Sequence, residues 1–300
     1  MVNISVDLAG LKLQNPIMTA SGTFGYGVEF SDFMDLDDLG AITLKSVTLE
    51  PREGNDPPRI LETPSGMMNS IGLANCGIKK FVEQKLPALN HLKRVKVIAN
   101  IAGHTISENE ELAKILNKES RVDALELNIS CPNVDAGGLA FCQDLNVVTK
   151  MVENVKASYK KPLIVKLSTN VSDVGVLAKV CVDSGADILS LINTVPGLEV
   201  DVDKKKLYFK RGYAGLSGPA IRPIALKAVY DVAQVVDVPI IGIGGVATIE
   251  DVIKFMMVGA NAVSVGMMNF SMPNISSQLT KELTTYLKNN KQQIQDLKIV

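Results

Sequence analysis

Eight short apolar segments, rich in β-branched residues, recur along the chain and constrain its fold more than any other feature. They cover residues 16–21, 41–46, 95–100, 124–130, 162–168, 187–193, 239–245 and 262–266. Between them lie stretches with apolar residues at helical spacing, such as SENEELAKILNK and IALKAVYDVAQVV. Strands that are apolar on both sides and alternate with helices predict a parallel sheet with both faces covered. Eight such units in 300 residues predict an α/β fold, a (β/α)8 or TIM barrel.

A doubly wound open sheet is the structural alternative to a barrel. Its dinucleotide-binding form carries G-x-G-x-x-G in the first turn, whereas the first apolar segment here continues into ASGTFGYG. We therefore expect a single barrel domain over residues 1–300.

Composition and charge exclude several classes of protein. The net charge of −1, with Lys and Arg scattered, gives no electrostatic case for binding nucleic acid. No secretory signal and no apolar run of membrane-spanning length is present, and the four cysteines lack C-x-x-C spacing. We expect a cytoplasmic protein that holds no metal and no iron–sulfur cluster of its own.

Two connections are longer than ordinary strand-to-helix loops. Residues 47–77 and 194–220 follow the second and sixth apolar segments, and residues 198–209 have the pattern of a small hairpin. Both connections would lie at the carboxyl end of the barrel, where the active sites of such barrels are built. We interpret them as top-face insertions, because long ordered loops in compact domains are usually functional.

Every apolar segment ends in a hydrogen-bonding side chain or a glycine. Lys45 and Lys166 are the most informative, because burying an unpaired ammonium costs several kcal/mol. We see no acidic residue facing them at neighbouring strand ends, so the two lysines predict a bound anion or electron-rich ligand.

Glycine-rich turns at the ends of the last two apolar segments indicate what this ligand carries. IIGIGGVAT and AVSVGMMNF, together with GLSGPA, resemble the backbone phosphate site common in these barrels. A flat, phosphorylated ring cofactor would be flavin mononucleotide (FMN). Asn69, Asn128 and Asn193 each offer amide donors and an acceptor that match a pyrimidine-dione edge.

Cys131 follows the fourth apolar segment in NISCPN. Taken alone, this segment favours a small buried hydrophobe, which is what most free cysteines are.

Long motifs, in order from about residue 3 to residue 285, resemble the dihydroorotate dehydrogenase family. They include ASGTFGYG, LKSVTLEPREGNDPPRILETPSGMMNSIGLANCG, ELNISCPNV, VKLS, LINT, GLSGPAIRPIAL, GIGGV and VGMMNF. More narrowly, they are similar to the catalytic subunit of the class 1B, NAD-linked enzymes. The resemblance implies a barrel that binds FMN and oxidises (S)-dihydroorotate to orotate in pyrimidine biosynthesis.

The resemblance also implies roles for individual residues. Cys131 would be the base that removes the C5 proton while the C6 hydride passes to FMN. The implied substrate-binding residues are Lys45, Asn69, Ser70, Ile71, Gly72, Leu73, Asn128, Asn193 and Thr194. The implied FMN-binding residues are Ser21, Lys45, Ser46, Asn100, Asn128, Lys166, Ile192, Gly218, Gly244, Gly245, Gly266 and Met267. Met267 stands where the family usually has threonine.

Class 1B enzymes pass electrons to NAD through a second subunit with FAD and a [2Fe–2S] cluster, in a heterotetramer built on a homodimer of the catalytic chain. NVDAGGLAF, after the cysteine motif, differs from the proline-rich segment of class 1A enzymes, which use fumarate. A class 1A enzyme, another FMN barrel acting on a reduced pyrimidine, and a non-catalytic barrel are the alternatives.

Overall fold

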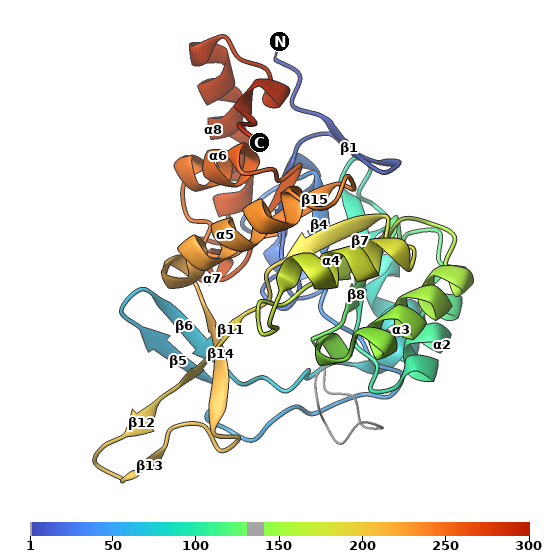
Figure 1. Ribbon diagram of the computed structural model, residues 1–300, viewed down its shortest axis with the longest axis vertical. Helices are drawn as coiled ribbons and strands as arrows, with labels where there is room; N and C mark the ends of the chain where they lie inside the picture. The colour runs from blue at the N-terminus through green and yellow to red at the C-terminus, as the bar shows by residue number, and fades with distance from the viewer. Residues whose placement is uncertain (1, 131–140) are drawn as a thin grey trace.

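The computed structural model describes residues 2–130 and 141–300, and its centre is a closed barrel of parallel strands (Figure 1). In chain order the barrel strands are β3 (Ile17–Thr19), β4 (Ala41–Thr43), β7 (Lys96–Ile101), β8 (Ala124–Asn128), β9 (Leu163–Lys166), β10 (Ile188–Leu191), β15 (Ile240–Ile243) and β16 (Ala262–Val265). The barrel closes because β16 pairs with β3 as well as with β15. The predicted (β/α)8 barrel is confirmed, and each strand falls on a predicted apolar segment to within one residue.

Helices surround the barrel, and four of the six longer ones begin at residues whose side chains cap them. The longer helices are α2 (Ile106–Leu116), α3 (Leu145–Ser158), α4 (Val174–Asp183), α5 (Arg222–Ala233), α6 (Ile249–Met257) and α8 (Ile275–Asn290). Thr105, Asp144, Asp173 and Thr248 accept hydrogen bonds from backbone N–H groups of α2, α3, α4 and α6, respectively. These bonds satisfy donors that have no partner within a helix, which fixes where each helix starts.

The first two connections of the barrel depart from the regular pattern. Short 3-10 turns at Val28–Phe30 and Leu36–Asp38 join β3 to β4. Between β4 and β7 lie the short helix α1 (Gly77–Lys80) and a π-helical turn, Phe81–Lys85. The connections that follow Ser21 and Lys45 therefore contain short helical turns in place of a long helix.

An antiparallel hairpin closes the amino-terminal end of the barrel. Its strands are β1 (Val6–Leu8) and β2 (Leu11–Leu13), whose leucines are buried against the apolar residues of the barrel interior. This plug covers the end of the barrel opposite the two long connections.

The two long connections form one additional sheet at that carboxyl end. Strands β5 (Ile60–Thr63) and β6 (Gly66–Asn69) come from the first, and β11 (Val195–Leu198) and β14 (Tyr213–Ser217) from the second. β14 pairs with β6, which joins both insertions in the order β11-β14-β6-β5. In Figure 1 this sheet projects below the barrel, and the predicted hairpin, β12 (Val200–Asp201) and β13 (Lys206–Leu207), extends from it.

Within residues 2–130 and 141–300, no helix combines the length and apolar character required to cross a membrane.

Candidate active site at the carboxyl end of the barrel

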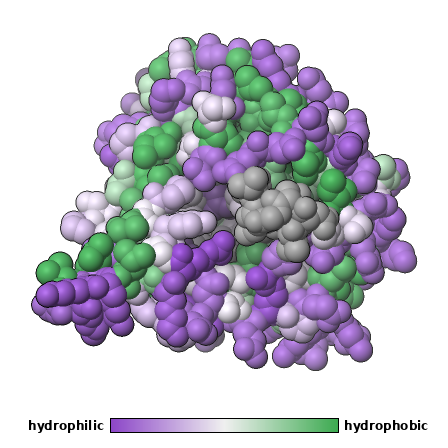
Figure 2. Space-filling view, turned by 60° about the horizontal axis from the view of Figure 1, so that its bottom comes forward, coloured by the Kyte–Doolittle hydropathy of each residue, from purple (hydrophilic) through white to green (hydrophobic). Residues whose placement is uncertain are grey.

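A cavity of about 560 Å³ opens among the carboxyl ends of the barrel strands and the inserted sheet. Figure 2 looks onto this end of the molecule, where a hollow lies near the middle of a face of mixed hydropathy. The cavity has the size and mixed lining of a site for a small molecule or cofactor.

Almost all of the predicted site residues line this single cavity. They are Ser21, Lys45, Ser46, Asn69, Ser70, Ile71, Gly72, Leu73, Asn100, Asn128, Lys166, Ile192, Asn193, Thr194, Gly218, Gly244, Gly245, Gly266 and Met267. Cys131, the predicted base, lies outside the described residues. Residues far apart in the sequence thus meet because parallel strands bring their carboxyl ends together.

The floor of the cavity is a polar layer inside the barrel. Asn100, Glu126, Lys166 and Ser190 lie on β7 to β10, each two residues after an apolar residue of the buried barrel interior. Because side chains alternate along a strand, residues two apart share a face, and this layer points inward above the apolar one. All four side chains are buried.

Glu126 corrects one prediction from the sequence. The Lys166 Nζ lies 3.9 Å from the Glu126 carboxylate, so an acidic residue does face one of the two lysines. Glu126 also accepts hydrogen bonds from Asn100 Nδ2 at 2.6 Å and from Ser190 Oγ at 2.8 Å. The sequence ALELN could have predicted this contact. Side chains two residues apart on a strand share a face, so Glu126 points to the same side as Ala124, into the barrel.

Lys45 differs from Lys166 because no described carboxylate pairs with it. It follows β4 at the cavity wall, and burial, the only cause of the shift, lowers its pKa from 10.5. An ammonium held without a counter-ion in a cavity is a site for an anionic ligand. The prediction of an unpaired inward lysine therefore holds for Lys45 alone.

Ser130 links two of the predicted asparagines. Asn128 Oδ1 accepts from Ser130 Oγ at 2.6 Å, and Asn193 Nδ2 donates to the same hydroxyl. Asn69, on β6, donates from Nδ2 to the Gly215 carbonyl at 3.4 Å. The three amides come from two barrel strand ends and the inserted sheet, and together they line the upper wall of the cavity.

The glycine turns bring backbone close to the cavity wall. Gly245 has φ 73°, and a Cβ there would lie 2.7 Å from Arg222 Cβ and 2.9 Å from the Gly218 oxygen. At Gly266, in contrast, a Cβ would meet only Ala20 Cβ, at 3.7 Å. Gly245 is therefore required by the fold, whereas the missing side chain at Gly266 leaves open space that a ligand can fill.

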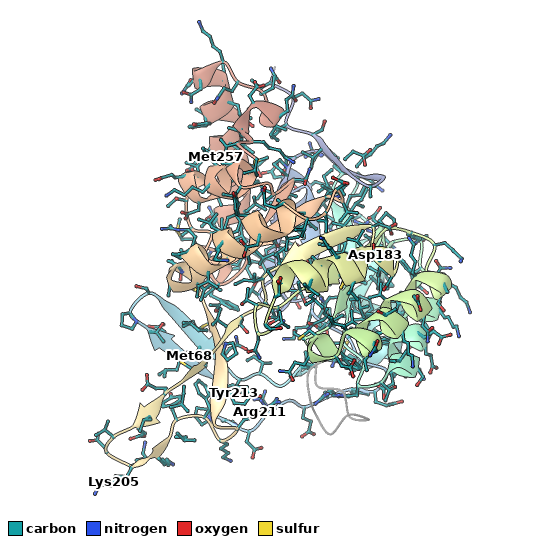
Figure 3. The ribbon with its side chains drawn as sticks, viewed as in Figure 1. Met68, Asp183, Lys205, Arg211, Tyr213 and Met257 are labelled. Carbon is teal, nitrogen blue, oxygen red and sulfur yellow. The ribbon has the colours of Figure 1, made fainter. Side chains whose placement is uncertain are left out.

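Arg52 and His104 are cavity residues that the sequence analysis did not single out. Their side chains contact each other, and both belong to the wall beside the first insertion. Arg211 and Tyr213 add to the wall from the second insertion, with the guanidinium carbon 5.7 Å from the tyrosine ring centroid (Figure 3). No local motif marks these residues. Arg52, Arg211 and Tyr213 come from the two insertions, whereas His104 lies in the loop after β7.

Metal-ligating clusters of His, Cys, Asp and Glu are absent from the part of the chain that the structure describes.

The family model for dihydroorotate dehydrogenase matches residues 3–287 of this chain. The chain belongs to the dihydroorotate dehydrogenase family. Two curated relatives of this family of oxidoreductases share the name of one branch. A dihydroorotate dehydrogenase B (NAD(+)) catalytic subunit from Geotalea uraniireducens is 50% identical over 288 residues, covering 96% of this chain and 94% of that protein. The subunit of the same name from a Thermoanaerobacter species is 48% identical over 286 residues, covering 95% and 94%.

A solved structure supports the fold of this dihydroorotate dehydrogenase family member. The enzyme of Eimeria tenella, in complex with ferulenol, superposes with a TM-score of 0.82 at 21% identity, covering 98% of this chain and 87% of that one. The family predicted from the sequence is confirmed by these comparisons.

Proposed function

We propose that this chain oxidises (S)-dihydroorotate to orotate in pyrimidine biosynthesis, as the FMN-binding catalytic subunit of an NAD-linked enzyme. The observation that carries the proposal is the full-length similarity, 48–50% identity, to subunits of that name. A single cavity lined by almost every residue predicted for substrate and cofactor supports it. In this proposal residues 1–300 form one FMN-binding barrel domain.

The described residues fit FMN at the floor and the glycine-rich wall of the cavity. Asn100 Oδ1 is buried without a described partner, so it is an acceptor that a ligand N–H can satisfy. Lys166 adds a cation, and the space at Gly266 suits a phosphate held by backbone N–H groups. The full set of proposed FMN-binding residues is the one that the family resemblance implies. Bound there, FMN would supply at N5 the hydride acceptor that protein side chains lack.

The opposite wall would bind the substrate. Lys45 has no described counter-ion and suits the anionic end of dihydroorotate, and Ser70 to Leu73 follow β6 along the cavity. Asn69, Asn128, Asn193 and Thr194 supply the donors and acceptors that a dihydropyrimidine-dione edge requires.

Cys131 is proposed as the base that takes the C5 proton as the C6 hydride leaves. A thiolate near cationic groups forms at a lower pKa than a free thiol. A positioned base typically contributes about 10²–10⁴-fold in rate.

The electron acceptor is proposed from the names of the relatives. A partner subunit carrying FAD and a [2Fe–2S] cluster would receive the electrons and pass them to NAD, within a heterotetramer built on a homodimer of this chain. The chain with its partner should reduce NAD, whereas turnover with fumarate by the chain alone would favour the class 1A alternative.

The proposed reaction can be tested with FMN-loaded protein and an artificial dye as acceptor. Orotate should form from dihydroorotate, with far less product from dihydrouracil, which lacks the carboxylate. Cys131→Ala should keep FMN and lose about 10²–10⁴-fold in rate. Oxidation of both substrates at equal rates would contradict the proposed specificity, and an unchanged rate in Cys131→Ala would remove Cys131 from the mechanism.

A further inference from the structure

The polar layer beneath the cavity contains a carboxylate that does not itself line it. Asn100 and Lys166 line the cavity, whereas Glu126 and Ser190 do not, and all four side chains are buried. We propose that Glu126 is a positioning residue, which fixes the amide of Asn100 and the ammonium of Lys166 toward the ring of a bound flavin. This inference rests on the proposed function, since it takes FMN as the ligand.

The first step is the orientation of the Asn100 amide. Its nitrogen and oxygen could exchange places by a half-turn, and hydrogen bonding decides between the two arrangements. Asn100 Nδ2 lies 2.6 Å from Glu126 Oε1, and an ionised carboxylate can only accept. Glu126 therefore holds the NH2 group toward itself, and the Asn100 oxygen is left as the acceptor without a described partner.

That oxygen has no hydrogen-bond partner among the described residues, although it is fully buried. A buried acceptor left unpaired destabilises the protein, and a hydrogen bond from a ligand N–H would remove that cost. The cavity floor thus presents an acceptor, Asn100 Oδ1, close to a donor, Lys166 Nζ. This arrangement matches a ring edge that carries both an N–H and an electron-rich atom, as the flavin ring does.

The second step concerns how firmly Glu126 is held. Ser190 Oγ donates to Oε2 at 2.8 Å, so both carboxylate oxygens are engaged, and the Lys166 Nζ stands 3.9 Å from Oε1. The side chains of Glu126 and Lys166 are only 4% and 7% exposed. Because its two oxygens are bound by residues of separate strands, the carboxylate is held in one orientation. It therefore also restricts the orientations of the Asn100 and Lys166 side chains.

The third step is electrostatic. Glu126 neutralises Lys166 beneath the flavin site, and charges interact strongly where water is excluded. Removing the negative charge would leave a net cation below the ring and favour the electron-rich reduced flavin. The midpoint potential of bound FMN should therefore move to a more positive value when Glu126 is made neutral.

Two variants separate charge from position. Glu126→Gln keeps the shape and loses the charge, and we expect at least a tenfold change in the ratio of oxidised to reduced FMN affinity, about 30 mV for a two-electron couple. Glu126→Asp keeps the charge but withdraws the oxygens by about 1.5 Å. We expect FMN affinity to fall at least tenfold in this variant while the potential stays near that of the original chain.

The matched control is Asp123→Asn, which removes a carboxylate that pairs with Lys96 and Arg121 just before the start of β8, at the opposite end of the barrel. It should leave the FMN potential and affinity unchanged. The readouts are FMN affinity by fluorescence titration and potential by anaerobic dye titration.

The outcomes distinguish this inference from the proposed function. Lower unfolding temperatures in both Glu126 variants, with unchanged FMN affinity and potential, would show a purely structural role and overturn the inference. If Glu126→Gln does not fold, the FMN affinity of Glu126→Asp alone tests the inference. An FMN affinity equal to that of the original chain would then overturn the inference. Failure of the unmodified chain to bind FMN would overturn the proposed function itself.

Discussion

Lys45 illustrates how a proposed binding residue can weaken the fold that carries it. Burial disfavours its charged form, and no described carboxylate compensates. We expect Lys45→Met to raise the unfolding temperature of the FMN-free protein by roughly 2 °C and to weaken orotate binding at least about tenfold, because a charged hydrogen bond is lost. Thermal unfolding and orotate titration measure the two effects. Lys206→Met, at an exposed position of β13, should change neither.

The same lysine predicts a pH dependence of stability. Its pKa is lower in the folded protein than the unfolded value near 10.5. Between these two pKa values the unfolded chain binds more protons, so this contribution to stability rises with pH. The advantage of Lys45→Met in unfolding temperature should therefore be largest below the folded pKa and vanish as pH approaches 10.5. An advantage that is constant with pH would show that the ionisation of Lys45 is not its cause.

Gly245 predicts a large cost from adding a single methyl group. Its φ of 73° is strained for other residues, and a Cβ would overlap Arg222 and the Gly218 oxygen. We expect Gly245→Ala to cost roughly 3 kcal/mol, from strain and overpacking together, and to reduce FMN binding. Gly10→Ala shares the positive φ but meets nothing within 4 Å, so about 1–2 kcal/mol is expected there. The free energy of unfolding of both variants can be measured by urea denaturation. Equal losses of stability would show that the positive φ alone, and not the overlap with neighbouring atoms, causes the effect.

For single residues, the sequence predicted which side chains line the cavity better than it predicted the hydrogen bonds and ion pairs between them. Lys45, Lys166 and the asparagines could be found because inward polar residues at strand ends are unusual. The partner of Lys166 was missed, although its place in the alternation of β8 was visible. Arg52 and His104 carried no such signal, since their contact joins two separate loops.

At the scale of elements, the inserted sheet has its own small core. Met68, Phe209 and Ala214 are buried together, apart from the main cores of the barrel. We expect Phe209→Ala to cost about 3–5 kcal/mol locally and to speed hydrogen exchange in β5, β6, β11 and β14 while the barrel strands stay protected. Ligand binding should weaken, because Asn69 lies on this sheet.

Phe255→Ala, in α6 and fully buried in the main core, is the control. It should lower protection throughout the barrel. Equal loss of protection in barrel and sheet upon Phe209→Ala would contradict the independence of the inserted sheet.

The inserted sheet also marks the limit of sequence analysis at this scale. The β12–β13 hairpin could be predicted, because its strands are close in sequence. The pairing of β14 with β6 joins residues nearly 150 positions apart, such as Asn69 and Gly215, and no local pattern encodes it.

For the whole molecule, the barrel could be predicted because the same pattern, an apolar strand followed by a helical stretch, recurs along the chain at eight apolar segments. Each barrel strand is mostly apolar, and side-chain caps mark the start of four of the longer helices. The plug of β1 and β2 was not predicted, since its short strands become recognisable only through their burial against the barrel interior.

The central claim is that this barrel binds FMN and that dihydroorotate reduces it there. The most direct measurement is an anaerobic titration of the FMN-loaded chain with dihydroorotate, followed by flavin absorbance. The account predicts that one equivalent of dihydroorotate per bound FMN bleaches the flavin and yields orotate. A chain that holds FMN but keeps its full absorbance with excess dihydroorotate would contradict it.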